Sequence, residues 1–109
     1  MATELTVRAD RGDDGDPRLI AVGEIDLSNV EDFTAALTAL LDGDTAAAVT
    51  VDLAAVEYLD SAAVNVLAIH ADQAARMRVI AHPYLIPVLR ISGICELADV
   101  HTADGSRAT

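Results

Sequence analysis

With 109 residues, the chain is long enough for one domain with a single modest core. Acidic residues outnumber basic ones by 18 to 7, and the net charge of −11 argues against binding to nucleic acid or an anionic membrane surface, since both would repel the protein. A single cysteine excludes an internal disulfide bond and is typical of a reducing compartment. The N-terminus does not resemble a signal peptide, and no apolar run approaches the ~20 residues that cross a bilayer. We therefore expect a cytoplasmic domain without membrane insertion.

The first part of the chain is typical of a β-hairpin. Residues 4–9 alternate between apolar and polar side chains, and residues 19–25 form a mostly apolar run. Between them, residues 10–17 (DRGDDGDP) are rich in turn-forming Asp and Gly. These aspartates lack the spacing of a calcium-binding EF-hand loop, because Gly12 stands where a ligand is needed and no Glu closes the loop. We predict two paired strands joined by a solvated loop.

A helix signal follows the second strand. Ser28 and Glu31 have the spacing of a capping box, in which each side chain accepts a hydrogen bond from the other residue's backbone N–H. Apolar residues then repeat at intervals of three and four, as on the buried side of a helix: Val30, Phe33, Leu37, Leu40 and Leu41. Gly43 is the expected left-handed cap at the C-terminus of this helix.

The middle of the chain combines a strand and a helix. Its apolar pattern predicts a buried strand at about 47–53 and a helix at about 61–74. Asp60 and Ser61 lie at the junction and are residue types that cap helices. A phosphoryl group on Ser61 would lie near free N–H groups and the positive end of the helix dipole, which would stabilise it. A simple helix cap explains the same two residues equally well.

The last third predicts shorter elements. We expect a strand at 76–81, then a helix within 84–92 that is irregular or starts late, because Pro87 is tolerated only in a first turn. Gly93 should end this helix. The next apolar residues, Ile94, Cys95 and Leu97, are expected to pack loosely before a short strand at 99–102.

Strands that alternate with helices predict an α/β fold. We expect a single domain at residues 4–102, with a mostly parallel sheet of four to five strands, an N-terminal hairpin and three helices mainly on one face. The small, polar residues 103–109 are expected to form a frayed tail.

No group of residues favours an enzyme. A nucleophile needs a nearby base, and the candidates are Ser61 or Cys95 with His70, His82 or His101. His70 lies too far along the helix that Ser61 begins to contact that hydroxyl. The histidines also lack the i, i+4 spacing of a helical metal site, and there is no glycine-rich phosphate loop. We expect no catalytic residue, metal or cofactor.

Three segments resemble the STAS domain of bacterial anti-sigma-factor antagonists. Residues 22–27 (VGEIDL) are similar to the family's G-E-hydrophobic-D segment. Residues 51–53 (VDL) and 58–61 (YLDS) are similar to its D-L…hydrophobic-D-S-[ST]-G segment, and residues 89–94 are similar to its L…[ST]-G-[LIV] close. The resemblance covers residues 4–102 and implies the STAS fold.

The resemblance implies a regulatory binding protein. In this family the domain docks on the ATP-binding kinase domain of an anti-sigma factor and frees the sigma factor to join RNA polymerase, a partner switch used in stress responses. The kinase then phosphorylates the antagonist in the D-S-[ST]-G motif and so releases itself. Transferred to this sequence, the resemblance implies a partner-binding surface at Asp26, Ser28, Asp60, Ser61, Ala62 and Asn65.

One position departs from the family pattern. Ala62 stands where the usual phosphoacceptor is found, and Ala63 replaces the following glycine. Either Ser61 takes over as acceptor, or the protein is never phosphorylated at this site. We favour the second hypothesis, because a shift of one residue along a helix turns a side chain by about 100°.

Two other functions stay open. STAS domains also serve as cytoplasmic subunits of ABC-type lipid transporters, where a lost phosphoacceptor would not matter. A domain that binds a nucleotide or another small ligand beside Asp26 and Asp60 is a weaker alternative, because acidic side chains repel phosphates. The sequence leaves open whether the chain dimerises.

Overall fold

The computed structural model describes residues 4–13, 15–43, 48–103 and 105. Within these ranges the chain forms five strands, four α-helices and one 3-10 turn. In chain order they are β1 (Leu5–Arg11), β2 (Pro17–Ile25), α1 (Val30–Gly43), β3 (Ala48–Leu59), α2 (Ser61–Gln73), β4 (Arg76–Ala81), η1 (Pro83–Leu85), α3 (Ile86–Ile91), α4 (Ile94–Leu97) and β5 (Asp99–Thr102).

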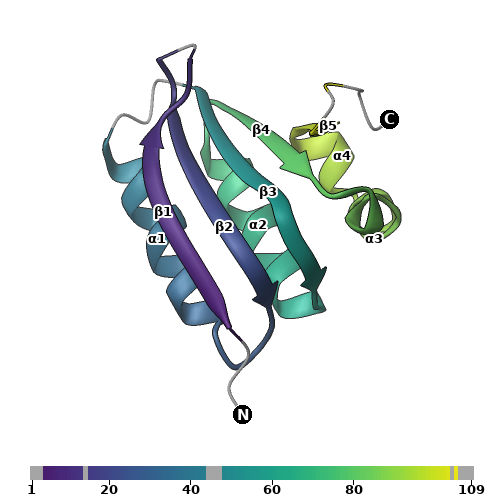
Figure 1. The fold of residues 1–109 in the computed structure, drawn as a ribbon. Helices are drawn as coiled ribbons and strands as arrows, with labels where there is room; N and C mark the ends of the chain where they lie inside the picture. Colours follow the sequence, from purple (N-terminus) through teal and green to yellow (C-terminus); the bar gives the residue numbers. More distant parts are fainter. Residues whose placement is uncertain (1–3, 14, 44–47, 104, 106–109) are drawn as a thin grey trace.

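The sheet keeps the strands in chain order, β1-β2-β3-β4-β5 (Figure 1). β1 and β2 pair antiparallel, and all later neighbours pair in parallel. The two long helices, α1 and α2, pack side by side against one face of the sheet, and α4 contacts α2 (Figure 1). The predicted α/β architecture, with its N-terminal hairpin and mostly parallel sheet, is confirmed. None of the described helices is long and apolar enough to cross a membrane.

The core forms where alternate strand residues meet the apolar stripe of α1 and the buried side of α2. Phe33, Leu37, Leu40 and Leu41 are buried and Val30 packs against the core, so the predicted stripe is confirmed. α1 ends at Gly43, and the residues that would show its cap, 44–47, lie outside the described ranges. Most of the predicted tail, 104 and 106–109, also lies outside them.

β3 is longer than predicted and runs without a connecting loop up to Asp60. The sequence suggested that it ends near Leu53, because the apolar alternation breaks there. The register with β2 shifts between Ile20 and Val22, and again between Gly23 and Glu24, as expected for β-bulges. At the first shift the Asp52 carboxylate accepts a hydrogen bond from the N–H of Ala54 at 3.0 Å. The strand therefore continues, although its side-chain pattern is interrupted.

Gly23 is required by the close approach of β1. Its φ of +114° lies in a region that other residues rarely adopt. A Cβ atom at this position would overlap the carbonyl oxygen of Glu4. The same carbonyl accepts a hydrogen bond of 3.1 Å from the N–H of Glu24, so the neighbouring backbone cannot move away freely.

The segment after β4 is more ordered than predicted. Pro87 lies in the first turn of α3, so the expectation of a late-starting helix is confirmed. Gly93 has a φ of +87° and separates α3 from α4. The prediction that Ile94 packs loosely is wrong, because it is fully buried in a one-turn helix and joins the core. β4 and β5 have the predicted bounds.

Candidate functional site

The sequence segments that flank Asp26 and Asp60 meet at one edge of the sheet. β2 and β3 are parallel, and their last residues, Ile25 and Leu59, are paired. Asp26 and Asp60 follow directly, so the two loops leave the sheet side by side. The N–H of Asp60 donates to the carbonyl oxygen of Ile25 at 3.1 Å, which joins the start of α2 to the end of β2.

Asp60 has two structural roles at this edge. It is the N-cap of α2, where its Oδ1 accepts a hydrogen bond from the N–H of Ala63 at 3.0 Å. Its Oδ2 accepts a second hydrogen bond, 2.9 Å long, from the N–H of Leu27 in the β2–α1 loop. One half-buried carboxylate therefore fixes the start of a helix and the shape of a loop distant in sequence.

The loop from β2 to α1 is held by Asp26 and Asn29, and the predicted capping box is wrong. The Ser28 hydroxyl and N–H both donate to Asp26 Oδ1 rather than pairing with Glu31. The buried amide of Asn29 accepts from the N–H of Asp26 at 3.0 Å and donates to the carbonyl of Glu24 at 3.0 Å. Aspartate and asparagine side chains readily form hydrogen bonds with nearby backbone groups. The Asp26 carboxylate therefore accepts the N–H of Ser28 that a capping box would assign to Glu31.

The first turns of α2 present the remaining predicted residues. Ser61 and Asn65 are exposed one turn apart, and Ala62 is half-buried beside them. Ser61 and Asn65 line a groove of about 350 Å³ between α2 and α3. Its other walls are mainly apolar and comprise Val64, Ala68, Val88, Ile91 and Ser92.

The apolar part of this surface was missed from the sequence. The side chain of Ile91 is 88% exposed and that of Leu27 is 77% exposed, which is unusual for large apolar residues. Leu27 lies next to the Asp60 carboxylate, and Ile91 lies across the groove from Ser61. Only the position of α3 across the groove from α2 brings Ile91 to the site, so no local sequence signal identifies it.

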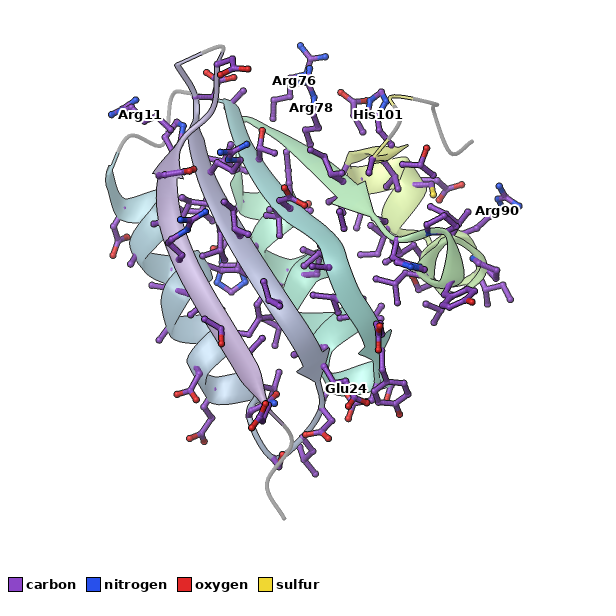
Figure 2. The ribbon with its side chains drawn as sticks, viewed as in Figure 1. Arg11, Glu24, Arg76, Arg78, Arg90 and His101 are labelled. Carbon is purple, nitrogen blue, oxygen red and sulfur yellow. The ribbon has the colours of Figure 1, made fainter. Side chains whose placement is uncertain are left out.

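Acidic side chains lie at this end of the molecule. Figure 2 shows Arg11, Arg76 and Arg78 toward the end of the sheet opposite to Glu24, which lies close to the loop edge. Asp26 and Asp60 extend the acidic character of that edge. A partner that docks here would need a basic and partly apolar face.

His70 and His82 form hydrogen-bond contacts with residues other than Ser61. His70 is buried, with its Nδ1 2.8 Å from the Val66 carbonyl oxygen and its Nε2 3.2 Å from the Thr38 hydroxyl. His82 accepts a hydrogen bond from the N–H of Tyr84. Among the residues that the structure describes, no three His, Cys, Asp or Glu side chains converge as metal ligands.

Comparisons with known proteins agree with this architecture. The family model described as "Mlab, STAS domain" matches residues 9–83. The chain is similar to the crystal structure of an anti-sigma factor antagonist from Mycobacterium paratuberculosis, with 24% identity over 93% of this chain and 89% of the other, and a TM-score of 0.82. It is also similar to the unphosphorylated anti-sigma factor antagonist SpoIIAA, with 15% identity over 91% and 90% of the two chains and a TM-score of 0.68. A comparison with curated proteins gave no match. At these identities the likeness to both structures shows a shared fold.

Proposed function

The chain belongs to the STAS domain family, and from this membership we propose that it is an anti-sigma-factor antagonist. It would bind the ATP-binding kinase domain of an anti-sigma factor in the cytoplasm and so regulate sigma-factor-dependent transcription. The fold that it shares with two antagonists supports this role. The proposal assigns the chain no reaction of its own. The proposed domain comprises residues 4–102, which include every described strand and helix.

The observation that carries the proposal is the surface built around Asp60. Its carboxylate ties the Leu27 loop to α2, directly beside the apolar groove that Ile91 lines. Exposed apolar side chains next to fixed acidic groups are typical of protein–protein interfaces, in which a few central residues supply most of the affinity. We therefore extend the docking surface beyond the residues implied by the family resemblance, to include Leu27, Val88 and Ile91.

We further propose that docking is not controlled by phosphorylation of the family's usual acceptor position. Ala62 has no hydroxyl, and it is half-buried at the start of α2. Ser61 is exposed, but a phosphoryl group there would lie beside the Asp60 carboxylate, and their like charges would repel each other. The surface would then be permanently competent to bind. Stoichiometric phosphate on Ser61, mapped by mass spectrometry after incubation with the partner kinase and ATP, would contradict this part of the proposal.

A second function is favoured by the same alanine. A STAS subunit of an ABC-type lipid transporter would need no phosphoacceptor, and its α2 and α3 would pack against another subunit. The two functions differ in their partner. A transporter permease or ATPase bound through the Ile91 groove would support the second function.

The decisive experiment measures complex formation with purified partners. Isothermal titration calorimetry of the full chain against the ATP-binding domain of a candidate anti-sigma factor should show a one-to-one complex. Displacement of the sigma factor from that anti-sigma factor should follow in a competition assay. Absence of binding to every anti-sigma factor of the source genome would reject the proposed function.

A further inference from the structure

The outer edge of β1 carries backbone groups that no other described strand pairs with. β1 pairs only with β2 among the described strands, so it forms one edge of the sheet. The N–H of Glu24 donates to the carbonyl of Glu4, and the N–H of Gly12 donates to the carbonyl of Asp16. These two bonds show that even-numbered residues of this strand direct their backbone groups at β2. The odd-numbered residues of β1 therefore direct theirs away from the sheet, as a template for another strand.

Apolar surface lies along the same edge. A groove of about 590 Å³ runs between β1 and α1. It stays open because Ala9, Ala36 and Ala39 are too small to close it, while Val7 and Leu40 contribute apolar walls. Val7 packs against the core but is only half-buried. Unpaired backbone and unfilled apolar surface thus occur together.

We propose that a second copy of this chain covers this edge, with the two β1 strands antiparallel and Ala9 on the two-fold axis. In this register Arg8 lies directly opposite Asp10 of the partner subunit. Because of the two-fold symmetry, this pair occurs twice in the dimer. The outward backbone groups of Ala9 would exchange two hydrogen bonds with their copies. Arg8 and Asp10 would then form non-hydrogen-bonded pairs, in which cross-strand side chains are closest.

Charge disfavours the two registers centred on Arg8 and on Val7. Placing Arg8 on the axis sets two arginines opposite each other, and placing Val7 there sets Glu4 opposite Asp10 of the partner subunit. Like charges directly opposite destabilise strand pairing, so both alternatives are disfavoured. In the described monomer Asp10 already forms two hydrogen bonds with Arg18, both 2.8 Å long. A carboxylate has about four acceptor sites, so it can bind a second guanidinium as well.

This dimer leaves the proposed docking surface accessible. The dimer proposal does not depend on the proposed function. Ala9 pairs with Leu19 near the start of β2, whereas Asp26 follows the end of β2. A two-fold axis through Ala9 therefore directs the two docking surfaces to opposite ends of the dimer.

Cross-linking tests the register. In the Cys95→Ser background, Ala9→Cys would bring two thiols together with their Cα atoms about 5.5 Å apart, within the range that a disulfide bridges. Mild oxidation should convert this variant to a covalent dimer. The matched variant Thr6→Cys should not cross-link, because its two copies would lie about 20 Å apart along the strands. Equal cross-linking of both variants, or cross-linking of Thr6→Cys alone, would overturn the proposal.

Sedimentation equilibrium tests the dimer itself, with circular dichroism melting as the check on folding. The full chain should show a monomer–dimer equilibrium, and Arg8→Glu should raise its dissociation constant by about tenfold or more, because two attractive pairs become repulsive. Arg90→Glu changes the net charge equally on the exposed surface of α3 and should leave the equilibrium unchanged. A chain that stays monomeric at all concentrations, or equal effects of the two reversals, would overturn the proposal.

Discussion

The Oδ2 atom of Asp60 accepts a hydrogen bond from the backbone N–H of Leu27, although the two residues are 33 positions apart in the chain. The other oxygen of the same carboxylate caps α2. Two elements of the proposed docking surface therefore depend on one side chain, and changes at Asp60 should affect both stability and recognition.

Asp60→Asn should separate these two roles. An amide has one acceptor oxygen and one NH2 group, so it can keep the cap on Ala63 but presents a donor to the N–H of Leu27. We expect a loss of about 1–3 kcal/mol in the free energy of unfolding, measured by urea denaturation, since a backbone donor is left without a partner. Asp32→Asn, on the exposed first turn of α1, is the control and should change stability by less than about 0.5 kcal/mol. Equal effects of both substitutions would show that the link to Leu27 contributes nothing.

Reversing the charge at Asp60 should affect binding more than folding. Asp60→Lys removes the cap on Ala63, which costs about 0.5–2 kcal/mol, and the acceptor for the N–H of Leu27, which adds about 1–3 kcal/mol. It also places a positive charge where the partner is expected to be basic. Calorimetry should show a larger loss in binding free energy than the loss in stability measured by urea denaturation. Unchanged affinity with reduced stability would leave Asp60 with a structural role alone.

Ile91→Asp should weaken partner binding without unfolding the domain. The side chain is 88% exposed, so the free monomer loses little when it is replaced. Removal of a central anchor residue from an interface typically costs more than about 1 kcal/mol, which corresponds to about fivefold or more in the dissociation constant. Leu97→Asp, on the exposed side of α4, carries the same chemical change outside the proposed surface and should bind as the unaltered chain does. Equal binding by both variants would remove Ile91 from the docking surface.

Gly23→Ala should be strongly destabilising. The substitution forces a Cβ atom onto the carbonyl oxygen of Glu4 and imposes a φ of +114° on a residue that disfavours it. We expect a loss of more than about 2 kcal/mol in the free energy of unfolding, since positive φ alone costs roughly 1–2 kcal/mol. Gly15 also has a positive φ, but a Cβ atom there meets open space. Gly15→Ala should therefore lose only the part of the unfolding free energy that the positive φ costs. Similar melting temperatures for the two variants would contradict the steric explanation.

The ion pair between Asp10 and Arg18 should make stability depend on pH at the acid end. The hydrogen-bonded Arg18 guanidinium holds the pKa of the Asp10 carboxyl below its ordinary value of 3.8. A carboxyl whose pKa is lower in the folded state stabilises the fold above the ordinary value, and this contribution is lost as the pH falls through the lowered pKa. Asp10→Asn should therefore melt slightly below the unaltered chain at neutral pH, and the difference should vanish in acid. A difference in melting temperature that does not change with pH would show that it arises from hydrogen bonding rather than from charge.

Local patterns were enough to predict most of the fold. The β4 and β5 bounds follow from short apolar runs between turn residues, and α1 follows from its apolar spacing. The extent of β3 could not be predicted, because the bulge stabilised by Asp52 interrupts the alternation that marks a strand. The capping box was wrong because Asp26 outcompetes Glu31 for the backbone N–H of Ser28.

The candidate site was only partly visible in the sequence. Asp26 and Asp60 were placed on one surface by the resemblance to the STAS family. Their actual connection through Leu27 depends on where the β2–α1 loop folds back. Ile91 reaches the site only because α3, which contacts η1 and α4, lies across the groove from α2, and no local pattern encodes this arrangement. Tertiary contacts therefore decided the part of the surface that the sequence did not reveal.

Because the strand order in the sheet equals the order in the chain, no strand has to be inserted between two that are already paired. Each strand can join the free edge left by its predecessor as the polypeptide leaves the ribosome, which keeps the separation between pairing partners short and favours rapid folding. The acidic loops at Asp26 and Asp60 would form first during synthesis, and α3 would follow with its apolar side chain at Ile91. A nascent chain would thus complete the proposed docking surface only after α3 has been synthesised.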